Sequence, residues 1–447
     1  MTNVITLERR REVFGWVIYD WANSAFQTTV VTVLIGPYLT ALAQAAVGDN
    51  GPVLRIGGFA AVTAKSLFPY SVSLSVLLQV VLLPVLGAMA DYTNTRKRLM
   101  AIFCYTGVAA TCLLFLIGGS RYLAGALLFV IANLSFGASN VLYNAFLNDV
   151  TSAERRDAVS SRGYALGYLG GGVLLGLDLL LLLYAGRLGL SRSAAVRVSL
   201  LSAGVWWGGF ALLTFTRLRS DSVTGRVPFA PAIALAAART RATLAELRRR
   251  PHTLRFLLAY MAYNDGIQTI IAVSTVFLAQ ELFVARGRTA DETFLIGLVL
   301  MIQFVAFFGA LLFERIAAAI NTKNAILLSL VVWTFIVIYA YGFLQTTSQA
   351  WAMGAVLAVV LGGSQALSRS LFSRMIPPGR EASFYGLYEI SERGTSWIGP
   401  FLFGAVAAAT GSYRQAILSL IVLFAAGLLI LALTNPTQAI REAEQPT

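Results

Sequence analysis

The sequence predicts an all-α polytopic membrane protein of twelve transmembrane helices, arranged as two pseudo-symmetric six-helix bundles. Of the 447 residues, 57% are hydrophobic and only 12% are charged, whereas a soluble globular chain carries about 25% charged residues. Apolar segments long enough for a membrane-spanning helix of about 20 residues recur along the whole chain. The two halves also carry similar polar residues at similar places. This composition excludes a water-soluble enzyme of ordinary type.

Twelve segments are apolar enough to span a bilayer. They lie at 14–43, 66–90, 99–119, 122–148, 159–184, 196–217, 254–281, 293–314, 324–344, 349–373, 383–409 and 414–434. The first segment follows Arg9, Arg10 and Arg11, as the apolar core of a secretory signal would. It is much longer than the roughly 7–15 residues of such a core, so we interpret it as a retained span, with cleavage as the alternative.

The longest loop divides the spans six and six. We expect an N-terminal bundle at 1–218, a linker at 219–253, a C-terminal bundle at 254–434 and a tail at 435–447. Most of the 34 Lys and Arg residues fall on the N-terminal side of this topology, so the positive-inside rule places both termini in the cytoplasm. The net charge of +13 therefore reflects topology, and no nucleic acid is expected as a partner.

The linker contains a predicted amphipathic helix. One face of this helix carries Ile233, Ala237, Leu244 and Leu247, and arginines elsewhere on it supply positive charge. Such a helix fits the anionic inner leaflet of the membrane. A solvated linker is the alternative.

Each half carries a related set of small and charged residues. Spans one and seven place a tyrosine beside an acid, in Tyr19-Asp20 and Tyr263-Asn264-Asp265. The ends of spans two and eight share a glycine, an acid and a base: Gly87, Asp91 and Lys97 in the first half, and Gly309, Glu314 and Lys323 in the second. A six-span unit used twice is typical of transporters that rock one half against the other.

Polar residues inside the spans are the candidates for a substrate site, because a charge at the bilayer centre costs on the order of 2.5–3.5 kcal/mol. The candidate substrate-binding residues are Trp16, Tyr19, Asp20, Trp21, Asn23, Gln27, Asn133, Asn140, Asn144, Asn264, Asp265, Gln268, Gln365 and Arg369. For Asp20 and Asp265 we favour protonation or amine binding, since a lone carboxylate is a poor structural contact. Structural hydrogen bonds between helices are the alternative for the amides. Asp178 is expected near the outer face.

A second set of residues is expected to gate the path. It comprises Gly87, Asp91, Arg96, Lys97, Glu389, Glu392 and Arg393. The glycine lets a neighbouring helix approach closely, and Asp91 can cap a helix N-terminus of the other half. A simple stop-transfer cluster is the alternative for this motif. Glu389 and Arg393, four residues apart, either neutralise each other or latch the cytoplasmic gate.

Histidine and cysteine, which often act in catalysis or bind metals, are scarce in this sequence. His252 is the only histidine, and Cys104 and Cys112 lie in one apolar stretch, a spacing that suits neither a disulfide framework nor a metal site. We therefore expect no catalytic residues, no metal and no cofactor, and a membrane enzyme lacks the constellation that it would need.

Several motifs resemble a known family. The segment 87–98 resembles the loop motif between helices 2 and 3 of the major facilitator superfamily, with an insertion between Asp91 and the basic cluster. The segments 19–26, 143–147, 163–172 and 362–370 are similar to its vacuolar effluxer-like (autophagy-related) branch. This resemblance implies a twelve-helix secondary transporter, and its fungal members are associated with amino-acid export from the vacuole.

The expected function is secondary active transport of a small solute, with amino acids as the implied class, by alternating access coupled to protons. The alternative is a lipid or amphiphile flippase with the same fold. Expected partners are the solute, protons and membrane lipids. The expected location is a bacterial inner membrane, with the protein as a monomer.

Overall fold

A computed structural model describes residues 2–48, 51–56, 59–93, 95–219, 229–289, 291–393 and 397–445. In these ranges, eleven helices are long and apolar enough to cross a membrane. The span expected at 383–409 is built differently. It consists of two helices, α14 (Glu381–Arg393) and α15 (Ile398–Thr410), neither of which is long enough to cross alone.

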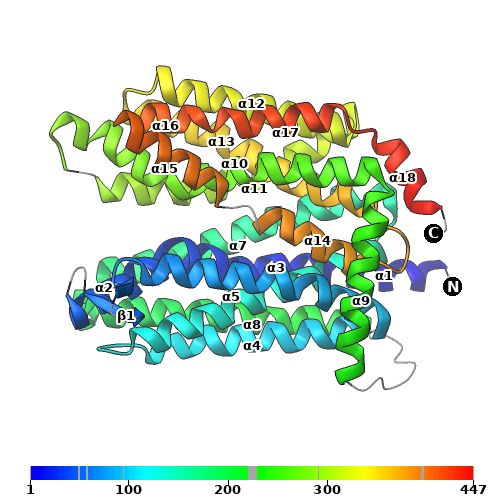
Figure 1. Cartoon of the computed structure of the whole chain (residues 1–447), viewed down its shortest axis with the longest axis horizontal. Helices are drawn as coiled ribbons and strands as arrows, with labels where there is room; N and C mark the ends of the chain where they lie inside the picture. The colour runs from blue at the N-terminus through cyan, green and yellow to red at the C-terminus, as the bar shows by residue number, and fades with distance from the viewer. Residues whose placement is uncertain are drawn as a thin grey trace.

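The helices of the first half form one bundle (Figure 1). They are α1 (Thr2–Ala25), the π-helix η1 (Phe26–Leu34), α2 (Ile35–Val47), α3 (Leu67–Thr93), α4 (Arg96–Leu113), α5 (Tyr122–Ala145), α6 (Leu147–Val150), α7 (Arg156–Tyr184) and α8 (Arg192–Arg217). Short 3₁₀ turns extend two of them: η2 (Leu114–Leu116) follows α4, and η3 (Ala153–Arg155) and η4 (Ala185–Leu188) flank α7. The core of this bundle is aromatic, and Phe26 lies 5.5 Å from Trp207 between ring centroids.

The second half forms the other bundle. Its helices are α10 (Pro251–Leu282) with the 3₁₀ turn η5 (Val284–Arg286), α11 (Glu292–Ile320), α12 (Thr322–Gly342), α13 (Thr347–Ser373), α14, α15, α16 (Tyr413–Ser419) and α17 (Ile421–Ala432). Trp333 and Phe424 stack in its core at 5.6 Å. Local sequence fixes several starts: Pro251 opens α10, and Thr346 with Gln349 forms a capping box at α13.

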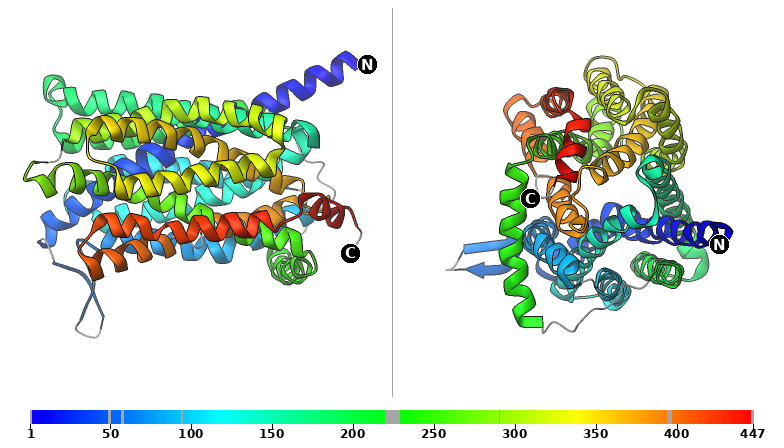
Figure 2. Two further views of the ribbon diagram at one scale, coloured as in Figure 1. Left: turned by 90° about the horizontal axis from the view of Figure 1, so that it is seen from above. Right: turned by 90° about the vertical axis from the view of Figure 1, so that its right-hand side faces the viewer.

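The two bundles lie side by side, and both termini emerge at the same end (Figures 1 and 2). We call this the terminal end and the opposite one the distal end. At the terminal end, α9 (Phe229–Arg248) runs across the ends of the spanning helices and contacts α3 and α14. The tail contains α18 (Pro436–Glu444), which contacts α10.

The helix α9 departs from the expected apolar face. Leu247 is buried, but Leu244 is 46% exposed, so these two residues do not lie in one buried stripe. The side chains of Ile233 and Ala237 lie outside the described residues. Polar contacts hold the C-terminal part of α9, where Glu246 pairs with Arg250 and Arg380 at 3.0 and 2.9 Å.

Two local features were not expected from the sequence. An antiparallel hairpin, β1 (Pro52–Ile56) and β2 (Phe59–Thr63), lies at the distal end between the first two spans. The Gly57-Gly58 pair between two β-prone runs is a hairpin signal that could have predicted it. The π-helix η1 in the first span has no such signal, and its position in mid-helix is typical of functional sites.

Candidate functional site

The two bundles meet at the terminal end where α3 contacts the start of α14. Asp91, at the end of α3, accepts hydrogen bonds from the backbone N–H groups of Ala382 (3.1 Å) and Ser383 (2.8 Å) and from the Ser383 hydroxyl. These N–H groups belong to the first turn of α14, where a helix has no internal partner for them and carries partial positive charge. Asp91 therefore caps a helix of the other half.

Arg96 completes this contact. Its guanidinium lies 2.9 Å from Asp91, and it also pairs with Glu381 of α14 and, at 3.2 Å, with Asp149. The side chains of Asp91 and Arg96 are only 5% and 11% exposed, so the network is largely removed from water. We call Asp91, Arg96, Glu381 and the first turn of α14 the α14 latch.

Glycines bring the two helices of this latch into contact. A Cβ atom at Gly87 would lie 2.1 Å from the carbonyl oxygen of Ala382, and one at Gly386 would lie 2.9 Å from that of Leu83. Both obstacles are backbone atoms, which cannot turn away as a flexible side chain can. Larger residues at Gly87 would therefore separate the helices.

A second contact joins the bundles through α7. Asp157, in the first turn of α7, accepts hydrogen bonds from Ser370 and from Thr322 (2.7 Å), and it pairs with Arg374 at 2.8 Å. We call these four residues the Asp157 latch. Next to it, Asn148 and Arg156 both donate to the Ser373 carbonyl, at 3.1 and 3.0 Å.

Further from the terminal end, Asp20 of α1 pairs with Arg369 of α13. Arg369 Nη2 lies 3.0 Å from Asp20 Oδ2, and the same arginine donates to Ser160 Oγ (2.9 Å) and to the Ser160 carbonyl (3.0 Å). Asn144 accepts a longer bond from it at 3.4 Å. The Arg369 side chain is 3% exposed. Asp20 is therefore not the lone carboxylate that we expected, because a cation of the other half neutralises it.

Aromatic rings surround this ion pair. The Arg369 guanidinium lies 4.7 Å from the ring of Trp16, 4.2 Å from that of Tyr164 and 5.7 Å from that of Tyr143. Gly163 makes room for it, since a Cβ there would lie 2.3 Å from Asp20 Oδ2. Cation–π contacts of this kind stabilise a desolvated guanidinium.

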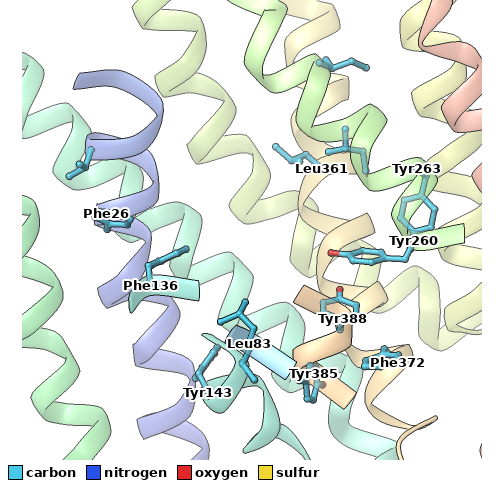
Figure 3. Packing of buried hydrophobic residues seen from close by; sticks show 14 of the residues in the cluster. Phe26, Leu83, Phe136, Tyr143, Tyr260, Tyr263, Leu361, Phe372, Tyr385 and Tyr388 are labelled. Atoms are coloured by element: carbon cyan, nitrogen blue, oxygen red, sulfur yellow. The ribbon is translucent and has the colours of Figure 1, made fainter. Parts of the chain in front are cut away.

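A second buried ion pair lies on α14. Glu389 pairs with Arg393 at 3.0 Å and accepts a hydrogen bond from Asn144 of α5 at 3.1 Å. The pair thus neutralises itself and also contacts the other half. The carboxylate is 2% exposed and the arginine 19%, so Arg393 is the more accessible group. On the same helix, Tyr388 stacks on Tyr260 at 4.4 Å and on Phe372 at 5.0 Å between ring centroids (Figure 3).

Several predicted amides make hydrogen bonds, one of which crosses between the bundles. Asn23 donates to Asn140 at 2.9 Å, and Gln365 accepts from Tyr168 of the other half at 2.7 Å. Asn264 donates to the backbone carbonyl of Glu392 at 3.0 Å. Two further glutamines on the candidate list, Gln27 and Gln268, are half-buried.

Other predicted residues point elsewhere. Trp21 stacks on Trp206 at 5.3 Å, on the α8 side of its helix. Asn133 donates to Ser75 at 2.7 Å within the first bundle. Tyr19 is fully buried and packs against Tyr143 at 4.8 Å.

Two expected charged residues also act within one half. Lys97 donates to the Leu218 carbonyl at 2.6 Å and so ties α4 to the end of α8. Asp265 accepts from the Gly399 backbone N–H at 3.0 Å and thereby caps the start of α15. Neither contact crosses between the bundles.

The sequence analysis missed several contributors to the interface. They are Tyr143, Asp157, Ser160, Tyr164, Tyr168 and Glu381. A signal existed for some of them, because Tyr164 and Tyr168 alternate with glycines in the 163–172 motif. Asp157 and Glu381 are charged residues near loops, where charged side chains are usually solvated.

The distal end is joined differently. In the described ranges, the hydrogen bonds and ion pairs between the bundles lie between the terminal end and the Tyr168–Gln365 contact. Beyond it the bundles meet by helix packing, as where Gly172 of α7 approaches Gln303 of α11. The described residues hold no group of three or more His, Cys, Asp or Glu side chains that could bind a metal ion.

Comparison with known proteins gives a consistent result. A family model described as "Vacuole effluxer Atg22 like" matches residues 8–444. The chain is 31% identical to an uncharacterized MFS-type transporter, YxiO, of Bacillus subtilis, over 94% of this chain and 93% of that protein. It is 28% identical to autophagy-related protein 22 of Coccidioides immitis, over 91% of this chain and 83% of that protein.

Solved structures show the same fold at low identity. The major facilitator transporter FucP in its outward conformation superposes with a TM-score of 0.69 at 11% identity, over 95% of this chain and 98% of that chain. A bacterial homologue of the iron transporter ferroportin, in an outward-facing state, gives 0.64 at 14% identity, over 95% and 98%. The expectation of an all-α, two-bundle transporter fold is confirmed.

Proposed function

This chain belongs to the vacuole effluxer Atg22-like family and is a membrane transporter of the major facilitator type, and from that premise we propose that it carries a small zwitterionic solute such as an amino acid. The observation that supports the proposal is a set of charges of both signs buried between the bundles. Asp20 with Arg369 and Glu389 with Arg393 form two ion pairs within one interface. An amino acid carries one positive and one negative charge. Its two charged groups can therefore replace partners in such ion pairs without leaving a buried charge uncompensated.

Arg393 is the group that we assign to the solute carboxylate. Its side chain is 19% exposed, whereas that of Arg369 is 3% exposed. A guanidinium binds a carboxylate through two parallel hydrogen bonds. The neighbouring Glu389 would then be released to hold the solute ammonium group.

The path is proposed to alternate between the two ends. With the α14 latch and the Asp157 latch formed, the terminal end is closed, and the solute reaches the interface from the distal end. Because most Lys and Arg residues lie at the terminal end, we place both termini in the cytoplasm, in a bacterial inner membrane. A single chain supplies both bundles, so we propose that the monomer is the transporting unit.

Protons are the proposed coupling ion. Protonation of Asp20 would remove the counter-charge of Arg369 and weaken the contact between α1 and α13. The interface could then open at the terminal end. Asp265, whose hydrogen bond from Gly399 lies within its own half, is the second candidate.

The test uses protein reconstituted into liposomes and a mixture of radiolabelled amino acids. We expect uptake to be driven by an inward proton gradient. Asp20→Asn should lose gradient-driven accumulation but keep solute exchange at equal pH. Arg393→Gln should raise KM by about tenfold or more, the factor that corresponds to about 1.4 kcal/mol.

Glu154→Gln is the matched control, since Glu154 is exposed and lies outside both ion pairs. Gradient-driven accumulation by Asp20→Asn at the wild-type level would remove Asp20 from coupling. The same liposomes should carry a labelled phospholipid. Translocation of that lipid without amino-acid flux would favour a flippase and reject the proposed substrate class.

A further inference from the structure

A buried acid lies apart from the interface, inside the first bundle. Asp178 of α7 is 3% exposed and, in the described part of the chain, takes part in no ion pair. It lies six residues before the end of α7 at Tyr184, which places it in the distal part of the span. An intramembrane carboxylate without a counter-ion is costly, so such a group normally binds something.

Hydroxyl groups from two other helices surround this carboxyl group. Ser202 of α8 donates to Asp178 Oδ1 at 2.9 Å. Ser199 of α8 and Thr29 of η1 also lie beside the Asp178 side chain. Ser199 and Ser202 are three residues apart, so one face of α8 presents both of them.

Part of this oxygen cluster is loosely bonded. Asp178 Oδ2, Thr29 Oγ1 and Ser199 Oγ are all buried, and none of them makes a hydrogen bond of good geometry among the described residues, although both hydroxyl groups lie beside the carboxyl group. Thr29 and Ser199 are both 0% exposed. Buried polar atoms are almost always well bonded in folded proteins, so three buried oxygens gathered at one place without well-formed hydrogen bonds offer lone pairs to a ligand.

The chemistry of the cluster specifies the kind of ligand. All its donors are oxygens, which suit hard cations rather than transition metals. The cluster carries a single negative charge, which a monovalent cation neutralises, whereas a divalent ion would leave a positive charge buried in the membrane. The π-helix supplies one of the oxygens, and π-helical turns commonly occur at such sites.

We propose that Asp178, Thr29, Ser199 and Ser202 form a binding site for an alkali cation of the sodium class between η1, α7 and α8. The site is separate from the Asp20–Arg369 pair and does not depend on which solute crosses between the bundles. Because η1 continues the helix that carries Asp20, an ion bound here would stabilise one position of the first span against α7 and α8.

The test measures thermal unfolding of the full-length protein in detergent. NaCl is titrated against choline chloride at constant ionic strength, and KCl is titrated in parallel. Because a ligand of the folded state raises its stability, we expect a saturable rise in Tm with Na⁺. Asp178→Asn should lose this rise. Thr29→Val should weaken the sodium affinity by about tenfold, as expected for the loss of about 1.4 kcal/mol.

Two variants serve as matched controls. Thr32→Val changes the same residue type in the same π-helix, but Thr32 is exposed and donates to the Gln27 carbonyl. Glu154→Gln removes an exposed carboxylate. Both should respond to sodium as the wild type does.

Equal Tm values in Na⁺ and choline would overturn the proposal, as would a wild-type sodium response in Asp178→Asn. A rise in Tm on acidification without any response to Na⁺ would also overturn it, because a proton would then be the occupant. If Asp178→Asn does not fold, Thr29→Val and Ser199→Ala decide. An unchanged sodium response in both of them would reject the site.

Discussion

The α14 latch and the Asp157 latch close the same end of the molecule by different means. In the α14 latch, an acid at the end of one helix caps the backbone of another, so the geometry of two helices must match. In the Asp157 latch, the acid lies in the first turn of its own helix and binds side chains, which can adjust. The α14 latch therefore requires one relative position of the two helices, whereas the side chains of the Asp157 latch can adjust when the helices move.

The α14 latch is also more deeply buried than the Asp157 latch. The side chains of Asp91 and Arg96 are 5% and 11% exposed, while those of Asp157 and Arg374 are 17% and 21% exposed. Loss of one partner from a largely buried pair leaves an uncompensated charge, whereas water takes over part of that role at a more exposed pair. We therefore expect the α14 latch to control closure of the terminal end more strongly.

The largest effect is expected from Asp91→Asn. Asparagine keeps one acceptor oxygen, but its NH₂ group faces an N–H donor of α14 or the Arg96 guanidinium. We expect a cost of about 3 kcal/mol to the closed state. Spin labels at the exposed positions Arg98 and Arg315, one in each half at the terminal end, should report a shift toward longer distances.

Asp149→Asn is the matched control for this prediction. Asp149 binds the same arginine at 3.2 Å, but its side chain is 52% exposed. The two variants should therefore differ strongly in their distance distributions. Equal effects would mean that capping of α14 contributes nothing beyond charge.

Gly87→Ala should have the next largest effect. The added methyl group would lie 2.1 Å from the Ala382 carbonyl oxygen, so α3 and α14 must move apart. Overpacking of this kind costs about 1–3 kcal/mol. We expect transport to fall by about tenfold, and the same spin labels to show a broadened distance. Gly209→Ala, at a site with no neighbouring atom within 4 Å, should transport like the wild type.

Asp157→Asn should have a smaller effect, of about 1 kcal/mol, because the amide still bonds to Ser370 or Thr322 and Arg374 reaches water. The spin-label distances should shift by less than in Asp91→Asn. A larger shift would reverse the ranking of the two latches and place the main control of closure at α7.

The α3 side of the α14 latch could be predicted from the sequence because its residues lie close together, whereas Glu381 on α14 was missed. Gly87, Asp91 and Arg96 fall within ten residues, and each residue type has a distinct physical role at a helix end. The Asp157 latch gives no such signal, since its acid and its partners lie far apart in the chain. The counterpart expected from the repeat, Glu314, does not take part in it.

The central site could be predicted only in part. Asp20 and Arg369 were both candidates, but 349 positions separate them, and the sequence does not specify which helix faces meet. Neighbours of Asp20 were misplaced for a related reason. Consecutive helical residues point about 100° apart, so Trp21 faces α8 while Asp20 faces α13.

The smallest effect is expected from Lys97→Gln, although this lysine belongs to the recognisable motif. Its ammonium group bonds to the Leu218 carbonyl of the same half. A glutamine can donate to the same carbonyl, so the spin-label distances should not change. Transport should stay within about twofold of the wild type, as expected for a change below about 0.5 kcal/mol at a partly exposed position. A shift comparable to that of Asp157→Asn would mean that the anchoring of α4 to α8 also holds the terminal end closed. Closure would then depend on the packing of the first bundle as well as on the contacts between the bundles.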